Sequence, residues 1–263
     1  MYFLPNLWIF AFQLLLIPEK DVHNRTFKSE TSKMNVLKLT SGREISYLNE
    51  VEIRMGIDER NGEERYKNEL ENMGISDITV HKYEGGFKIW ECTIDLCDFI
   101  EENKTKFEGK SVLELGCGAA LPSILTAMHG AKEVYAQDFN ASVIEFFTVP
   151  NFEENPHSAI VQGEAMGWED VPTKLNGRKF DFILSSETIY NEDDYQNLHD
   201  AVAATIKDDG VAWFAAKFFY FGVGGSVPSF CQFINERGVL IASETKVITA
   251  SVPRRIIEIR KAL

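Results

Sequence analysis

The sequence predicts an α/β fold built on a doubly wound, mostly parallel β-sheet. Between residues 111 and 216, short apolar runs with strand character alternate with segments whose apolar residues recur at helical spacing. Glycine-containing turns separate these runs, and the first run ends at Gly116 and Gly118. Repeated strand–helix units place successive strands parallel to each other and cover the sheet with helices. The 263 residues, 44% of them hydrophobic, are enough for one large domain with extensions.

The predicted elements begin with a β-hairpin. An alternating pattern over residues 35–54, interrupted at Ser41 and Gly42, indicates this hairpin, and the charged run 58–72 indicates a solvated loop or a surface helix. Helical spacing over Glu91–Glu102 predicts a helix ahead of the first strand of the sheet. Strands are then expected at 111–115, 133–137, 159–162, 180–185 and 211–216, and helices at 121–129, near 141–147, at 194–206 and near 228–236.

The C-terminal residues contain two β-branched runs, 239–249 and 255–260, with no helix between them. Two strands in direct succession predict a terminal antiparallel hairpin. Along the whole chain, we therefore expect an N-terminal extension over 1–33, the first hairpin and charged loop over 34–84, and the main domain over 85–263.

The first residues of the chain are apolar. Met1–Ile17 contains only Asn6 and Gln13 as polar residues, has no basic residue and is interrupted by Pro5. This length is marginal for a membrane span, and the basic start of a signal peptide is missing. We expect residues 1–33 to be a dispensable extension and membrane attachment to be absent, although a targeting role for Met1–Ile17 stays open.

The net charge of −13 bears on the class of partner. Binding to nucleic acid requires many Lys and Arg residues against the phosphates, so a nucleic acid is not expected as the direct substrate. A basic protein would be attracted to an acidic surface, although the same charge can also serve solubility alone. The four cysteines form no C-x-x-C pair and no cluster with zinc-ligand spacing, so no metal is expected and the thiols fit a reduced, intracellular protein.

The segment Ser111–Gly118, SVLELGCG, predicts a nucleoside-cofactor site. Glycines after a strand let the backbone approach a nucleotide, and Asp138, at the exposed tip of the next strand, is placed to accept both ribose hydroxyls. A dinucleotide fingerprint needs a third glycine where this chain has Leu121. The acid Glu114, two residues before Gly116, suits the amino-acid end of S-adenosylmethionine. The alternative is an ordinary turn that binds nothing.

Three further strings occur in a fixed order around this turn. They are GGFKIWECTID at Gly85–Asp95, QDFN at Gln137–Asn140 and SSETIYN at Ser185–Asn191. Together with LELGCG they resemble the histidine protein methyltransferase 1 family, from about residue 83 to residue 210 and more loosely to the end. The resemblance implies a seven-strand, Rossmann-like methyltransferase sheet, S-adenosylmethionine as cofactor, a histidine of a large-subunit ribosomal protein as target, and a cytoplasmic and nuclear location.

The resemblance also implies which residues bind the cofactor. The segment before the first strand lines it, with Trp90 as a wall against the adenine or the sulfonium, unless this tryptophan only anchors the first helix in the core. Gly116 and Gly118 allow close approach, and Asp138 binds the ribose. The other residues implied at these places are Ile89, Glu91, Cys92, Thr93, Gln137 and Phe139.

An acidic residue after the third strand is implied to meet the adenine. The family pattern there is G-D-W, whereas this chain has Gly163, Glu164 and Ala165, with Trp168 shortly beyond. Either Glu164 or a residue beside Trp168 takes this role, and Glu164 is favoured.

The end of the fourth strand supplies the remaining candidates. Ser186 is expected to bind the cofactor, and Glu187, Tyr190 and Asn191 to orient the incoming side chain, because ligands bind at the carboxyl ends of such strands. The alternative for Ser186 and Asn191 is to cap the following helix.

These observations favour a protein-histidine N-methyltransferase. Imidazole is largely neutral at pH 7 and needs orientation more than a strong base, whereas a lysine must first lose a proton. The alternatives are a protein-lysine N-methyltransferase of the related branch, an inactive cofactor-binding interaction module, and a nicotinamide oxidoreductase.

Overall fold

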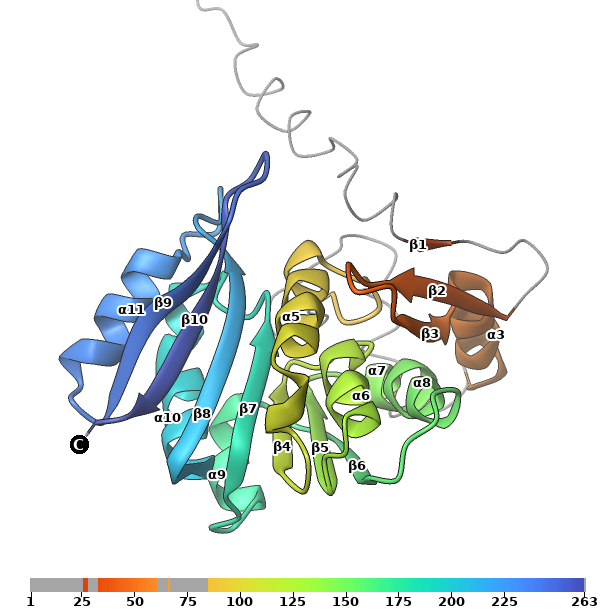
Figure 1. Cartoon of the computed structure of the whole chain (residues 1–263), viewed down its shortest axis with the longest axis horizontal. Helices are drawn as coiled ribbons and strands as arrows, with labels where there is room; N and C mark the ends of the chain where they lie inside the picture. Colours follow the sequence, from red (N-terminus) through yellow and green to blue (C-terminus); the bar gives the residue numbers. More distant parts are fainter. Residues whose placement is uncertain (1–25, 28–32, 61–65, 67–84, 263) are drawn as a thin grey trace, which may run out of the picture.

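The computed structural model describes residues 26–27, 33–60, 66 and 85–262 (Figure 1). In this part of the chain the central sheet has seven strands in the order β6-β5-β4-β7-β8-β10-β9. Strands β4 to β8 are parallel, and β10 pairs antiparallel with both β8 and β9. The doubly wound sheet and the terminal hairpin are therefore confirmed. The strands are β4 Ser111–Leu115, β5 Glu133–Asp138, β6 Ile160–Ala165, β7 Phe180–Ser186, β8 Ile206–Lys217, β9 Leu240–Ile248 and β10 Arg254–Lys261.

Helices cover both faces of the sheet. Because side chains alternate along a strand, Val112 of β4 packs in one core cluster and Leu113 and Leu115 pack in the other. The first cluster lies under α5 Glu91–Glu102, α6 Leu121–Met128, α7 Ala141–Val143, the π-helical turn η3 Ile144–Thr148 and α8 Val149–Glu153. The second lies under α9 Val171–Lys174, α10 Tyr195–Thr205 and α11 Val227–Glu236.

The predicted N-terminal hairpin is formed by β2 Met34–Lys38 and β3 Glu44–Leu48, with the short β1 Thr26–Phe27 beside β2. Helix α3 Glu50–Arg60 follows, so the charged run 58–72 begins inside a helix. Leu37 and Ile45 of the hairpin belong to the same core cluster as α6. Except for Tyr66, the charged run beyond Arg60 lies outside the described residues. Residues 1–25 and 28–32 also lie outside them, so the expectation that residues 1–33 are dispensable stays a prediction.

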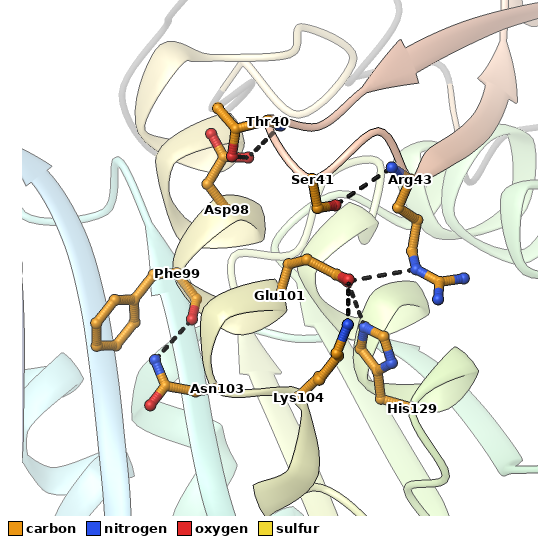
Figure 2. A network of polar contacts seen from close by, with 9 residues as sticks. All are labelled: Thr40, Ser41, Arg43, Asp98, Phe99, Glu101, Asn103, Lys104 and His129. Atoms are coloured by element: carbon orange, nitrogen blue, oxygen red, sulfur yellow. Dashed lines mark hydrogen bonds and ion pairs between the residues drawn. The ribbon is translucent and has the colours of Figure 1, made fainter.

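Helix α5 is fixed at its outer side by polar contacts (Figure 2). The backbone N–H and the hydroxyl of Thr40, in the hairpin turn, both donate to Asp98 Oδ1 at 3.0 Å. Glu101 Oε2 lies 3.3 Å from Arg43 Nε and 2.6 Å from Nε2 of His129, which follows α6. The contacts from the hairpin and from His129 therefore define the position of α5.

Two strands differ from the expected bounds. Strand β6 continues to Ala165, where a loop was expected from residue 163, because backbone pairing with β5 extends to Asp138 despite the lack of branched apolar side chains. Strand β8 begins directly after α10 at Ile206, and a register shift near Phe180 accommodates the extra residues before Val211. Pairing in the sheet overrides local propensity in both cases.

Among the described residues, no helix combines the length and the apolar character that a membrane crossing requires. Met1–Ile17 lies outside those residues, so a targeting role for this segment is not tested.

Candidate active site

The predicted site residues follow parallel strands that end at one edge of the sheet (Figure 1). The chain runs from β4 outward through β5 and β6, and then returns to the other side of β4 at β7 and β8. Ligands of open α/β sheets bind outside the carboxyl ends of the strands at such a reversal. Gly116, Asp138, Glu187 and Lys217 lie at or directly after the ends of β4, β5, β7 and β8.

The glycine turn after β4 has no room for side chains. Gly116 and Gly118 have φ of +66° and +50°, which disfavours other residues. A Cβ on Gly116 would lie 2.7 Å from Cγ2 of Thr188, and a Cβ on Gly118 would lie 2.9 Å from the carbonyl oxygen of Gly86. Both positions therefore require glycine, because Thr188 and Gly86 pack closely against them. The predicted close approach of this turn to a cofactor stays a prediction.

Gln137, at the end of β5, connects the glycine turn to the segment after β6. Its Oε1 accepts from the backbone N–H of Gly116 at 3.2 Å and from Nε1 of Trp168 at 3.1 Å. Its Nε2 donates to the carbonyl oxygen of Met166 at 2.6 Å. Trp168 thus lies beside the turn, 3.7 Å from where a Cβ of Gly116 would be.

Asp138 is buried, not exposed as expected, with only 5% of its surface accessible. Its Oδ2 accepts from the backbone N–H of Gly118 at 2.9 Å, and Oδ1 accepts from the backbone N–H of Asn140 at 3.2 Å. Gly86 covers it closely, since a Cβ there would lie 3.4 Å from Oδ1. The expectation was wrong because the segment before α5 folds over the strand tip.

The N-terminus of α5 lies against the end of β7. Trp90 is the N-cap residue and is half-buried, so it does not belong to the core and can form a wall. Its Nε1 donates to the carbonyl oxygen of Gly85 at 3.2 Å, and the ammonium of Lys88 lies 4.3 Å from its ring centre. One turn further, the hydroxyls of Thr93 and Ser186 are 2.9 Å apart.

Two buried carboxylates share one buried ammonium at this place. Lys217 Nζ lies 3.1 Å from Glu91 Oε2 and 3.7 Å from Glu187 Oε1, and the side chains are 16%, 2% and 5% exposed. The N–H of Cys92, in the first turn of α5, donates to Glu187 Oε1 at 3.4 Å. We call Glu91, Glu187 and Lys217 the ionic triad.

Glu187 has a left-handed backbone conformation, with φ of +58°. A non-glycine residue held in this region is strained, and such strain persists only where several contacts determine it. The ammonium of Lys217 and the positive end of the α5 dipole supply those contacts. The backbone and the side chain of Glu187 are therefore fixed together.

The charges of the triad follow from burial and pairing. Burial raises the pKa of Glu187, against the opposing effect of Lys217. Burial also lowers the pKa of Lys217, but the two carboxylates outweigh it and the pKa of this ammonium is raised. Two acidic side chains face one basic side chain here, a set that suits a cationic ligand. Burial and Glu187 raise the pKa of Tyr220, so its hydroxyl stays protonated and donates to that carboxylate.

Glu114 lies behind the glycine turn rather than beside a ligand. The side chain is fully buried on the α6 face of the sheet, and Oε2 accepts from the backbone N–H of Ser123 at 3.0 Å. Burial raises the pKa of Glu114 to about 8. This contact orients the start of α6. The contact of Glu114 with the amino-acid end of S-adenosylmethionine stays a prediction.

Two further candidates have other partners. Glu164 belongs to β6, where its carboxylate accepts from the hydroxyl of Tyr135 and lies 3.5 Å from the ammonium of Lys174. Asn191 caps the short helix η5 Glu192–Asp194, since its Oδ1 accepts from the N–H of Asp193 at 3.2 Å. The capping alternative is therefore confirmed for Asn191, and Trp168 rather than Glu164 contacts the glycine turn.

The remaining candidates have packing contacts. Tyr190 is buried against Tyr220, with ring centres 6.4 Å apart. Gly163 packs closely against η3, since a Cβ there would lie 3.1 Å from Ile144 Cγ2. Ile89 and Ala165 are half-buried, Cys92 is fully buried, and Phe139 is 37% exposed at the tip of β5.

The sequence analysis missed Lys217, Tyr220 and Thr188 as site residues. Lys217 is a single cation directly after the buried run of β8, at the strand end where ligands bind. That position was a usable signal. Thr188 and Tyr220 have no comparable signal, because their roles depend on which loops meet at the edge.

The comparisons with known proteins agree with this geometry. Residues 69–218 match the profile of a family described as lysine methyltransferase. Histidine protein methyltransferase 1 of Saccharomyces cerevisiae is 31% identical to this chain, over 71% of the chain and 68% of that protein. This chain belongs to the histidine protein methyltransferase 1 family. The family's homologue in Rattus norvegicus is 36% identical over 70% of the chain, and the match spans 58% of the rat protein.

Solved structures show the same fold. A putative S-adenosylmethionine-dependent methyltransferase from Streptococcus mutans has a TM-score of 0.58 at 14% identity, over 89% of this chain and 57% of that one. A 16S rRNA methyltransferase of T. thermophilus has a TM-score of 0.56 at 14% identity, over 88% and 50%. At these identities the likeness concerns the fold alone, and it confirms the seven-strand methyltransferase sheet.

The described residues fit S-adenosylmethionine, the cofactor of this fold family. Asp138 places a carboxylate beside the glycine turn, under the segment that contains Gly86, and the ionic triad offers acidic side chains for a sulfonium. Trp90 adds an aromatic face at the same edge. A dinucleotide site would need a third glycine where Leu121 is buried, so the oxidoreductase alternative is not supported.

Proposed function

We propose that this protein transfers a methyl group from S-adenosylmethionine to a histidine of a basic protein of the large ribosomal subunit. The mammalian and Dictyostelium relatives named histidine protein methyltransferase 1 homolog, at 34–37% identity, support the histidine. The net charge of −13 supports a basic protein as the partner. The structural observation behind the proposal is the buried carboxylate of Glu187, which Lys217 holds at the carboxyl ends of the parallel strands. A cytoplasmic and nuclear location belongs to the same proposal.

S-adenosylmethionine, when bound, supplies a methyl group on a positively charged sulfur. The chain itself holds the reactants: Asp138 binds the ribose, and Trp90 forms a wall. The ionic triad stabilises the positive charge that the imidazole gains as it takes the methyl group, while the sulfur becomes neutral. Positioning of this kind accounts for most of the rate in such a displacement, because the reacting atoms must be aligned.

Glu187 is proposed to orient the target imidazole. Its carboxylate accepts a hydrogen bond from one ring N–H, so that the lone pair of the other ring nitrogen faces the methyl group. After transfer the ring is a cation, and the proton on the first nitrogen leaves through Glu187, whose raised pKa suits it to accept one. The strained backbone of Glu187 keeps the carboxylate in this orientation.

A lysine target is the second candidate. The matched family profile is described as lysine methyltransferase, and a Candida albicans protein named as an N-terminal and lysine N-methyltransferase is 26% identical over 55% of this chain. A lysine side chain has a pKa near 10.4, so it would have to lose its proton before attack. The ionic triad, with two acidic side chains and one basic side chain, would stabilise the ammonium form and oppose that loss.

Labelled S-adenosylmethionine and an extract of ribosomal proteins test the proposal. We expect label in a basic protein of the large subunit, resistant to ribonuclease and removed by protease. The Asp138→Asn variant serves as the control with weakened cofactor binding. Label in nucleic acid, or no transfer to any protein, would contradict the proposal.

A further inference from the structure

The loop between β8 and α11 exposes large apolar side chains. Phe219, Phe221 and Val223 are 50%, 75% and 49% accessible, although they lie within five residues of each other. Gly222 and Gly224, with φ of +86° and +96°, form the turn that places them outward. A cluster of exposed aromatic and aliphatic side chains is unfavourable in water and marks an interaction site more often than it occurs by chance.

The backbone of this loop is well fixed. Phe219 and Ser226 form a β-bridge, and the N–H of Phe218 donates to the carbonyl oxygen of Pro253 at 2.7 Å. The N–H of Tyr220 donates to Gly225 at 2.9 Å. The apolar side chains are therefore presented on a defined turn, and a partner that binds them loses little loop entropy.

The same loop is joined to the proposed target-binding residues. The N–H of Gly225 donates to the carbonyl oxygen of Tyr190 at 2.9 Å, and the rings of Tyr190 and Tyr220 pack together. The hydroxyl of Tyr220 accepts from the backbone N–H of Lys217 at 3.2 Å, and the ammonium of Lys217 lies 3.7 Å from Glu187. One loop thus contacts Lys217 of the ionic triad on its inner side and presents Phe219 and Phe221 to solvent.

Two exposed acidic residues follow the segment to which the loop is bonded. Glu192 and Asp193 lie in η5, within three residues of Tyr190, whose carbonyl oxygen accepts from Gly225 of the loop. Exposed carboxylates and aromatic faces both attract cations, so together they complement a partner with basic and apolar side chains. The overall charge of −13 has the same sign.

We propose that the loop 218–225, with Glu192 and Asp193, is the docking surface for the polypeptide substrate, and that it binds a segment with apolar and basic side chains beside the methylated residue. This inference rests on the proposed function, because the substrate must be a polypeptide. We call this surface the docking loop. It supplies contacts with the segment around the methylated residue that the buried side chains of the triad cannot supply.

A triple variant tests the docking loop. In Phe219→Ser/Phe221→Ser/Val223→Ser we expect the KM for the protein substrate to rise at least tenfold, with kcat at saturation within twofold of the wild type. Affinity for S-adenosylmethionine and the thermal midpoint should stay unchanged, because the replaced side chains are exposed and do not touch Asp138. A second variant, Glu192→Gln/Asp193→Asn, should raise KM about threefold and weaken its dependence on salt.

The matched control is Val239→Ser/Ile241→Ser. These residues are 50% and 52% exposed, and they lie by the start of β9, at the end of the sheet opposite to Lys217. The control should retain the wild-type KM. Unchanged KM in the triple variant, with methyl transfer by the wild type intact, would contradict the docking loop alone, whereas no transfer by the wild type would contradict the proposed function. A wild-type dimer that the triple variant converts to a monomer would assign the surface to a second copy of the chain and overturn the inference.

Discussion

Nζ of Lys217 lies 3.7 Å from Oε1 of Glu187, at the carboxyl ends of two adjacent parallel strands. The same ammonium lies 3.1 Å from Glu91 at the start of α5. One side chain thus connects three elements and compensates two buried carboxylates. A buried charge that loses its partner lowers the stability of the folded protein, so replacing any one of the three side chains affects the other two.

Replacing Lys217 by methionine tests the unit. Without the ammonium, the pKa of Glu187 rises further, because the largest effect that opposes burial is lost. We expect kcat to fall at least tenfold and the acid limb of the pH–rate profile to move to higher pH, since more of Glu187 is protonated at a given pH. Lys88→Met is the control, because Lys88 lies near Trp90 but forms no part of the triad. An unchanged profile in Lys217→Met would remove Glu187 from the mechanism.

The Asp138→Asn variant tests cofactor binding. The amide oxygen can still accept from the N–H of Gly118, so the glycine turn is retained, while the charged acceptor for the ribose is lost. Hydrogen bonds to charged groups contribute about 1.5–3 kcal/mol each, so the Kd for S-adenosylmethionine should rise tenfold or more. Calorimetry that finds the wild-type affinity in a folded variant would show that Asp138 does not bind the cofactor.

The contact between His129 and Glu101 predicts how stability depends on pH (Figure 2). Burial lowers the pKa of His129 below its ordinary value of 6.5, against the raising effect of Glu101. Below pH 6.5 the unfolded chain therefore takes up a proton that the folded chain resists, and stability is lost as the pH falls. The pKa of Glu101 is also lowered, since hydrogen bonds from Lys104 and His129 outweigh burial, so its contribution is lost only below about pH 4.5.

The His129→Gln variant keeps a hydrogen-bond donor but does not titrate. Its free energy of unfolding should be lower than that of the wild type at pH 7.5, and the difference should narrow as the pH falls to 5.5. The narrowing is at most about 1.4 kcal/mol per pH unit. Denaturant unfolding at several pH values measures it. A difference that widens on acidification would mean that His129 is charged and paired with Glu101 in the folded state.

The sequence allowed the sheet, the terminal hairpin and the glycine turn to be predicted, because each has a local pattern. Gly116 and Gly118 follow a buried strand, and Asp138 ends the next one. The position of Lys217 at the end of β8 could have been predicted too, but its pairing could not, since its partners Glu91 and Glu187 come from distant segments. Glu164 was expected in a loop but belongs to β6, the outermost strand of the sheet. Pairing with β5 extends β6 beyond its apolar residues.

Local sequence patterns also did not predict how the site side chains are buried or bonded. Asp138 has the expected place at a strand tip, but Gly86 covers it from a segment that precedes the sheet in sequence. Asn191 lies in the expected loop, but its side chain caps η5. In both cases the position at the strand end could be predicted, whereas the packing or hydrogen-bond partner of the side chain could not.

The identity of the methylated residue tests the central claim most directly. The wild-type protein is incubated with labelled S-adenosylmethionine and large-subunit ribosomal proteins, and the labelled protein is hydrolysed to single amino acids. We expect the label in methylhistidine, with a rate that falls below pH 6.5 as imidazole is protonated and changes little between pH 7.5 and 9. Label in methyllysine, with a rate that still climbs through pH 9, would contradict the histidine assignment and establish the lysine alternative.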